Sequence, residues 1–177
     1  MDAATIEAAR RGDRRAQAQL LTALQDVWYR FCLSQLRNAD QAADATQETA
    51  LRFLKQLSGF RGDSQLQTWS LGIALNVTRE IRRKNRGDTS MIDPNDAQLA
   101  AEQSSAGSAV EVQEERAQMR SMLQTLPDRQ REAIVLRFFE EMSVEQTAAA
   151  MNCAVGTVKA TVHQALRALR QKMSSSR

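Results

Sequence analysis

The feature of this chain that most constrains its fold is the scarcity of proline and glycine, the two residues that interrupt helices. Its 177 residues include only two prolines and seven glycines. Proline removes a backbone donor and glycine loses much conformational freedom on folding, so both disfavour helix interiors. The rest of the sequence is rich in alanine, leucine, glutamine, arginine and glutamate, and it lacks the apolar and polar alternation typical of strands. We therefore predict an all-α protein.

Apolar residues at three- and four-residue spacing predict four helices in the first half of the chain. The expected helices span about residues 3–11, 13–37, 40–57 and 65–85. The breaks between them fall at Gly12, at Asn38 and at the pair Ser58 and Gly59. We expect these helices to form a bundle around a shared core.

Residues 142–170 have the pattern of two helices that meet at a sharp turn. Ser143 can cap the first helix, at about residues 144–151, while Gln146 reaches back as in a capping box. Asn152 tolerates the left-handed conformation that a tight turn needs. The expected buried stripe of the second helix is Val155, Val158, Val162, Leu166 and Leu169. This pattern indicates a helix-turn-helix, a motif that binds duplex DNA, and an ordinary helical hairpin is the alternative.

The opposite face of that second helix carries polar groups that can contact phosphates and base edges. The candidate DNA-binding residues on it are Thr157, Lys159, Thr161, His163, Gln164 and Arg167. Ala160 lies among them and is small enough to allow close approach. The alternative interpretation is a solvated polar face.

Charge is distributed unevenly along the chain. Residues 1–86 carry 14 basic and 9 acidic groups, residues 87–115 carry no basic and 7 acidic groups, and residues 116–177 carry 10 and 5, for net charges of +5, −7 and +5. The middle segment also collects turn-forming residues. We therefore predict two helical domains, 1–86 and 116–177, joined by an acidic flexible linker, 87–115. The linker is a simple tether or, alternatively, a mimic of nucleic acid that lies in a cationic channel of a partner.

The third expected helix begins with an acidic, amide-bearing surface that includes Asp44, Gln47 and Glu48. The helix dipole favours acids near a helix N-terminus and can explain Asp44, whereas Glu48 lies deeper in the helix. After this helix comes the loop Phe60, Arg61, Gly62, Asp63 and Ser64, followed by Trp69. Such a loop could hold an unstacked base between an aromatic wall and backbone donors. The alternative is a helix connector with a core tryptophan, preceded by Ser64 as a helix cap.

The fourth expected helix becomes strongly basic towards its end. Its candidate nucleic-acid contacts are Asn76, Arg79, Arg82 and Arg83, with Lys84 and Arg86 nearby. Only Glu80 balances this charge. A solvated face is the alternative, but the excess of cations favours a track for nucleic acid with salt-dependent binding.

Several functional classes are disfavoured. The sequence has one histidine, and Cys32 and Cys153 stand far apart, so we predict no metal site, no cofactor and no catalytic residue. We expect both cysteines to be reduced structural thiols, with a redox pair as the alternative. No stretch has the length and apolarity of a membrane span, and the first residues lack the pattern of a signal peptide, so we expect a cytoplasmic protein without membrane insertion.

The order and spacing of the motifs resemble those of bacterial sigma factors of the extracytoplasmic function group, within the sigma-70 family. The motifs are Asp44-x-x-Gln47-Glu48, Phe60-Arg61-Gly62-Asp63-Ser64, Thr68-Trp69, Ile73-Ala74-x-Asn76, Leu126-Pro127, Arg131-Glu132, Val135-Leu136-Arg137 and Val155-Gly156-Thr157-Val158-Lys159. The resemblance covers nearly the whole chain. It implies a non-enzymatic subunit that binds core RNA polymerase and directs it to promoters through two helical domains, called regions 2 and 4.

The resemblance also implies roles for individual residues. The surface of Asp44, Gln47, Glu48 and Leu51 would dock on the clamp helices of the largest polymerase subunit. The loop at 60–64, with Asn76 and the basic helix end, would take the opened non-template strand of the minus-ten element. The helix from Val155 would enter the major groove of the minus-thirty-five element, and the segment 127–140 would touch the polymerase flap. Family members are often held inactive by an anti-sigma factor.

The chain departs from the usual family pattern at positions where DNA is read. Ala160, Thr161, Gln164 and Leu166 stand where the family commonly has serine and arginines. Ser70 and Gly72 stand where it tends to have a larger apolar and a basic residue, and Ala50 and Leu54 replace aromatics. The fold should survive these changes. They support an alternative function, a sigma-like regulator that acts mainly through protein contacts and has weakened promoter recognition.

Overall fold

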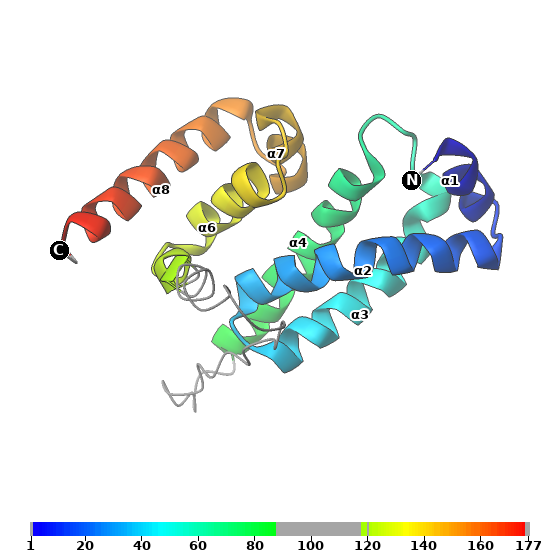
Figure 1. The fold of residues 1–177 in the computed structure, drawn as a ribbon, viewed down its shortest axis with the longest axis horizontal. Helices are drawn as coiled ribbons and strands as arrows, with labels where there is room; N and C mark the ends of the chain where they lie inside the picture. The colour runs from blue at the N-terminus through cyan, green and yellow to red at the C-terminus, as the bar shows by residue number, and fades with distance from the viewer. Residues whose placement is uncertain (1, 88–117, 120, 176–177) are drawn as a thin grey trace, which may run out of the picture. The chain divides into compact units, whose positions relative to one another are not determined.

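The computed structural model describes residues 2–87, 118–119 and 121–175, and all the regular secondary structure in these ranges is helical (Figure 1). This confirms the predicted all-α class. The chain divides into two compact units, Met1–Asp96 and Ala97–Arg177. The predicted linker, 87–115, lies outside the described residues except for Gly87.

The first unit consists of α1 (Ala3–Arg10), α2 (Arg14–Leu36), α3 (Ala39–Gln56) and α4 (Leu66–Gly87), with a short 3-10 turn, η1 (Leu57–Gly59), after α3. The predicted helices agree with these bounds to within two residues. Three of the starts have a side-chain cap, because Asp2, Asp13 and Asn38 each accept a hydrogen bond from the backbone N–H three residues later. Helices α2, α3 and α4 all contact one another, and α1 packs on α2.

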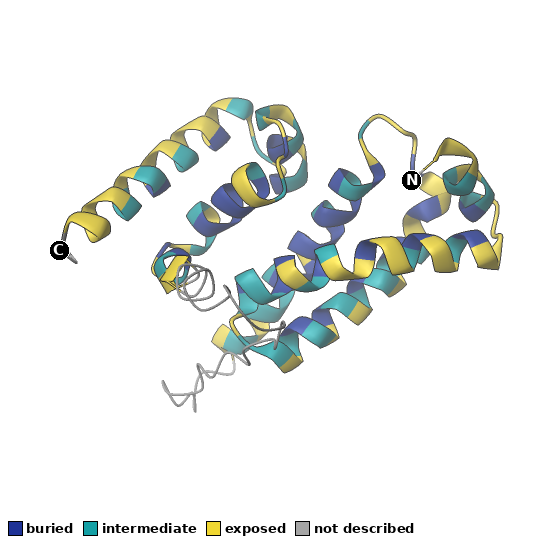
Figure 2. Ribbon diagram, in the orientation of Figure 1, coloured by how far each residue is buried: buried dark blue, intermediate teal, exposed yellow. Residues whose placement is uncertain are grey.

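Aromatic side chains form the centre of this unit. The Trp28 and Phe53 rings lie 5.2 Å apart, Phe53 and Trp69 lie 5.7 Å apart, and Trp69 and Phe60 lie 5.2 Å apart, all measured between ring centroids. The indole Nε1 of Trp28 donates a hydrogen bond of 2.9 Å to the Ser70 hydroxyl. Buried residues line the inner sides of α2, α3 and α4 (Figure 2). The loop before α4 is thereby anchored to the core through a series of tilted ring contacts.

The second unit contains α6 (Asp128–Ile134), a π-helical turn η2 (Val135–Phe139), α7 (Val144–Met151) and α8 (Val155–Ser175). Both α6 and α7 contact α8. The predicted capping box is present, because the Ser143 hydroxyl accepts from the Gln146 N–H while the Gln146 side chain accepts from the Ser143 N–H. Asn152 ends α7 in the left-handed conformation, with φ of 51°. The predicted helix-turn-helix is therefore confirmed.

The buried stripe of α8 differs from the expected one. Only Val158 and Ala165 are fully buried, whereas Val155, Val162, Leu166 and Leu169 are half-buried. Residues seven apart lie nearly on the same side of a helix, so Val158 and Ala165 mark the line of closest packing. Ala165 was not predicted to be buried, because so small a side chain contributes little to an apolar sequence pattern.

Candidate functional site

The predicted polymerase-binding residues lie together on one face of α3. Asp44, Gln47, Glu48 and Leu51 follow the spacing of helix neighbours. Asp44 and Gln47 are exposed and Glu48 is half-exposed. The Leu51 side chain is 55% exposed, although it is a large apolar residue. The face therefore combines acid, amide and leucine groups that all reach solvent.

Glu48 takes part in an ion-pair network that sequence reasoning missed. Its Oε1 accepts from the Nε of Arg52 at 2.6 Å. The two terminal nitrogens of Arg52 donate to the two carboxylate oxygens of Glu80 at 2.7 and 2.8 Å. Helix α3 is thereby joined to α4 by a fork of two parallel bonds. The four-residue spacing could have revealed the first pair, whereas Arg52 and Glu80 are 28 residues apart.

The network changes the ionisation of its members. Hydrogen bonds from Arg52 lower the pKa of Glu80 below its ordinary value, and the charges of Arg52, Arg83 and Lys84 add to this effect. Hydrogen bonds to Glu80 and Glu48 raise the pKa of Arg52 further above its usual range. Both groups therefore remain charged around neutral pH.

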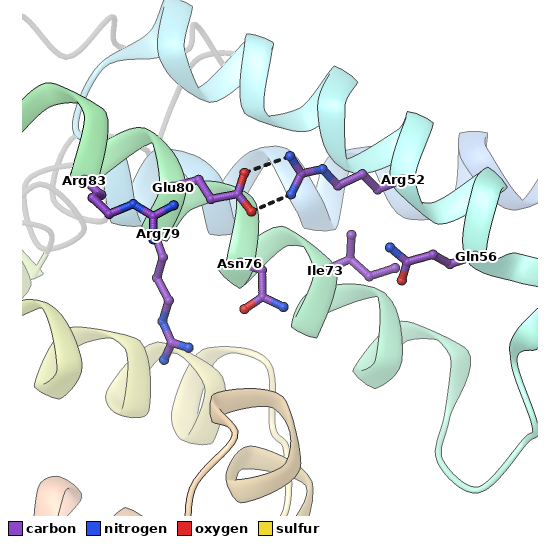
Figure 3. Close-up of a pocket in the computed structure, with 7 residues that line it drawn as sticks. All are labelled: Arg52, Gln56, Ile73, Asn76, Arg79, Glu80 and Arg83. Atoms are coloured by element: carbon purple, nitrogen blue, oxygen red, sulfur yellow. Dashed lines mark hydrogen bonds and ion pairs between the residues drawn. The ribbon is translucent and has the colours of Figure 1, made fainter.

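An open pocket lies between α3 and α4 beside this network (Figure 3). Its lining residues are Arg52, Gln56, Ile73, Asn76, Arg79, Glu80 and Arg83. Three of the predicted DNA-binding residues, Asn76, Arg79 and Arg83, are brought together here. In Figure 3 the paired Arg52 and Glu80 span the space between the helices, with Asn76 on α4 next to them. The pocket is thus polar, with a cationic excess.

Arg82 lies on a different face of α4. Its Nη1 donates to the Gln35 side chain on α2 at 3.4 Å, and the residue is half-buried. Successive helical residues are rotated by about 100°, so Arg82 and Arg83 cannot share one face. Arg82 contacts the bundle while Arg83 is exposed, so these two members of the predicted nucleic-acid track lie on different faces of α4.

The loop before α4 separates into a buried base and an exposed tip. Phe60 is only 7% exposed and its ring contacts that of Trp69 at a tilt of 46°, while Trp69 is half-exposed. Arg61, Gly62 and Asp63 are exposed. Gly62 has φ of 81°, a conformation that side-chain-bearing residues rarely adopt. Only Trp69 of the two aromatic residues therefore has substantial exposed area.

Ser64 is half-buried and lies two residues before the first residue of α4. The position directly before the helix is occupied by Gln65, whose carbonyl accepts from the Trp69 N–H at 3.0 Å. The expected cap at Ser64 is therefore one residue too early.

The candidate DNA-binding residues of α8 are mostly exposed. Thr157, Lys159, His163, Gln164 and Arg167 reach solvent. Thr161 is half-buried. Hydrogen bonds with the backbone and with Ser143 lower the pKa of Glu145 on α7, and the nearby Lys159 contributes to this shift.

Two exposed phenylalanines were not singled out from the sequence. Phe138 and Phe139 in η2 are each 52% exposed, and the Arg137 guanidinium lies 5.9 Å from the centre of the Phe138 ring. A π-helical turn has one extra residue in its hydrogen-bonded ring and shifts the following side chains around the axis. Leucine and valine neighbours are buried while the phenylalanines face outward, a result that helical periodicity does not predict.

The cysteines lie in separate units and both are free thiols. Burial raises the pKa of the Cys32 thiol to about 12, which makes it a poor nucleophile. Among the described residues no cluster of three histidine, cysteine, aspartate or glutamate side chains could hold a metal ion. Within the same ranges, no helix combines the length and apolarity needed to cross a bilayer.

Comparison with known proteins gives two family matches. Residues 20–87 match the family described as Sigma-70 region 2, and residues 116–169 match the family described as Sigma-70, region 4. One relative, the ECF RNA polymerase sigma factor EcfG of Rhodopseudomonas palustris, is 37% identical over 145 residues, which cover 82% of this chain and 76% of the relative. The RNA polymerase sigma-H factor of Pseudomonas aeruginosa is 31% identical over 176 residues, with coverage of 95% and 91%.

Solved structures show the same fold. The sigma factor RpoE from Bartonella quintana, in complex with the anti-sigma factor NepR, matches with a TM-score of 0.71 and 27% identity, over 90% of this chain and 98% of that one. CnrH, in complex with the cytosolic domain of CnrY, matches with a TM-score of 0.72 over 98% of this chain and 97% of that one. Its identity is 21%, so this second match supports the fold alone.

Proposed function

The chain belongs to the extracytoplasmic function group of the sigma-70 family and is a sigma factor, and we propose that it carries its two binding functions on separate units. Residues 1–86 act as region 2, which binds core RNA polymerase and the minus-ten element. Residues 116–177 act as region 4, which binds the minus-thirty-five element. Residues 87–115 link the two.

Polymerase binding is assigned to the face of α3 that carries Asp44, Gln47, Glu48 and Leu51. The exposure of Leu51, at 55%, is the observation that most supports this proposal. An apolar side chain surrounded by polar ones is typical of an interface, where the centre excludes water and the rim stays polar. The capping role of acids does not account for a leucine in solvent. Burial of Leu51 against a partner would account for it.

Binding of the opened minus-ten strand is assigned to the α4 side of the pocket and to the neighbouring loop. Asn76 can form hydrogen bonds with a base edge, while Arg79 and Arg83 can neutralise phosphates. Trp69 offers a partly exposed ring, and the exposed tip at Arg61, Gly62 and Asp63 offers donors. Phe60 contacts the Trp69 ring, and Phe60 and Ser64 are assigned to the same strand-binding loop. Extrusion of a base costs a few kcal/mol, and such contacts would offset this cost.

Recognition of the minus-thirty-five element is assigned to α8. Lys159 and Arg167 would contact phosphates, while His163, Gln164 and Thr157 would contact bases, with Thr161 at the margin. Few cations lie on this face, and Glu145 is near Lys159. We therefore expect weak binding by this unit alone, with a shallow dependence on salt.

Regulation by an anti-sigma factor is also proposed. The Bartonella quintana structure, which has 27% identity with this chain, contains a sigma factor and an anti-sigma factor. Shared fold and family support the same type of partner for this chain.

Run-off transcription tests the function. The purified full chain is added to core RNA polymerase and a set of genomic promoter fragments, and transcripts starting at defined positions are expected. Core polymerase alone and a chain carrying Leu51→Asp are the controls. Tight binding to core with no transcript from any fragment would contradict promoter recognition and favour the alternative of a sigma-like regulator that acts through protein contacts.

A further inference from the structure

The Glu80 carboxylate lies in the middle of the surface that is proposed to bind DNA. It lines the same pocket as Asn76, Arg79 and Arg83. A negative charge beside a phosphate track weakens binding, because affinity depends on the number of phosphates neutralised. A helix end that binds a DNA strand should therefore avoid a carboxylate or hold it away from the strand.

The geometry of Arg52 holds this carboxylate on the side of α3. Both oxygens of Glu80 accept from Arg52, at 2.7 and 2.8 Å, so these two bonds direct the carboxylate towards α3. The remaining Nε of Arg52 donates to Glu48 at 2.6 Å, which fixes the plane of the guanidinium. Arginine is suited to this task since its donors form a rigid fork that matches a carboxylate.

We infer that Arg52 is a positioning residue for promoter DNA, which clamps Glu80 against α3 and leaves Asn76, Arg79 and Arg83 to contact the strand. This inference rests on the proposed function of α4. Stability does not account for the arrangement, because partly exposed ion pairs typically contribute only about 0–1 kcal/mol. What the network determines is the location of a negative charge.

The charges that line the pocket allow a test in which one substitution should lower DNA affinity and a second substitution should restore it. Three arginines and one glutamate line it, a net charge of +2. Arg52→Met keeps the apolar stem but reduces the net charge by one and releases Glu80. Glu80→Gln removes the carboxylate and keeps an acceptor for Arg52. The double variant gives the pocket its wild-type net charge. It lacks the Arg52 guanidinium that holds Glu80, and it also lacks the Glu80 carboxylate that has to be held.

The experiment uses holoenzyme assembled from the full chain and core polymerase. The probe is a forked DNA whose minus-ten region is single-stranded, taken from a fragment that gives a run-off transcript. Binding is measured by filter retention over a range of salt concentrations. For Arg52→Met we expect a loss of about five-fold at 0.1 M salt and a slope of log affinity against log salt that is shallower by about 0.7, the value for one phosphate contact on a single strand.

The second substitution should reverse the effect of the first. We expect Glu80→Gln to bind as tightly as wild type or more tightly, and the double variant Arg52→Met with Glu80→Gln to regain wild-type affinity and slope. A purely structural role for Arg52 predicts the opposite, because removing Glu80 as well would not restore a lost tether. Core affinity and thermal unfolding are measured for each variant, so that misfolding is recognised.

Arg10→Met is the matched control. Arg10 pairs with Glu7 at 2.8 Å in the same unit, and neither residue lines the pocket. This variant should leave DNA affinity unchanged. A double variant that binds DNA as weakly as Arg52→Met would overturn the inference while leaving the proposed function intact. A wild-type holoenzyme that starts no transcript would instead refute the proposed function.

Discussion

Ser70 is a small polar residue at a core position of α4, and its hydrogen bonds account for its presence there. Its hydroxyl accepts from the buried Trp28 indole and donates to the Gln67 carbonyl at 2.8 Å. A buried indole N–H needs an acceptor, since leaving it without one costs much of its hydration energy. An apolar side chain at this position could not accept this hydrogen bond from Trp28.

Ser70→Ala should destabilise the first unit by about 1–3 kcal/mol, the usual cost of an unsatisfied buried polar group. Urea unfolding of the full chain, followed by circular dichroism, measures the change. Ser58→Ala at an exposed position is the control and should leave the free energy of unfolding almost unaltered. Equal stability of the two variants would mean that the Trp28 bond contributes nothing.

Leu51 supports a second prediction for a single residue. Leu51→Asp should weaken binding to core polymerase by about ten-fold or more, because truncation of a central apolar contact typically costs over 1 kcal/mol. Binding to immobilised core polymerase measures the effect. Met173→Asp is a matched control, since Met173 is 57% exposed and lies in the other unit. If the two variants lost affinity equally, this α3 face would not be the docking surface.

Helix α4 shows that one basic segment can serve two purposes. Its end is held to α2 by Arg82 with Gln35, and to α3 by Asn85 with Gln41, whose side chains are joined at 3.2 Å. Arg83, on another face, lines the pocket. The cations of one helix are thus divided between anchoring and the proposed DNA contact.

Single substitutions on α4 should separate these two roles. Arg83→Ala should lower the affinity of the holoenzyme for forked promoter DNA several-fold and reduce the salt slope by about 0.7, with little change in stability. Arg82→Ala should mainly lower the midpoint of thermal unfolding. Filter binding and circular dichroism on both variants provide the comparison. The reverse pattern would show that the faces of α4 have been misassigned.

Local signals explain why the elements could be predicted from the sequence. Asn38 caps α3, Ser143 caps α7 and Asn152 takes the left-handed turn, and each acts within a few residues along the chain. The contact between the Phe60 and Trp69 rings and the ion pair of Arg52 with Glu80 depend on residues brought together only by packing. Sequence spacing does not predict contacts of this kind. The π-helical turn that exposes Phe138 is a third such case, since it breaks the helical period itself.

At the scale of the whole molecule, the first unit has a core of its own, in which the four rings of Trp28, Phe53, Phe60 and Trp69 are in contact. A unit with its own core can fold without the rest of the chain. A fragment of residues 1–96 should therefore unfold cooperatively and still bind core polymerase. Thermal unfolding and binding to immobilised core test this, with the full chain as reference. A broad, non-cooperative transition would show that this unit depends on the remainder of the protein.

The chain has only two tryptophans, and Trp28 and Trp69 both belong to the first unit. The two chromophores differ in surroundings, because Trp28 is fully buried and hydrogen-bonded while Trp69 is half-exposed beside the loop tip. Intrinsic emission therefore reports on this unit alone, and the helix-turn-helix unit is silent at the same wavelengths. A nucleobase that stacks on Trp69 would quench one of the two emitters and leave the other as an internal standard. The protein thus carries its own optical probe of strand capture.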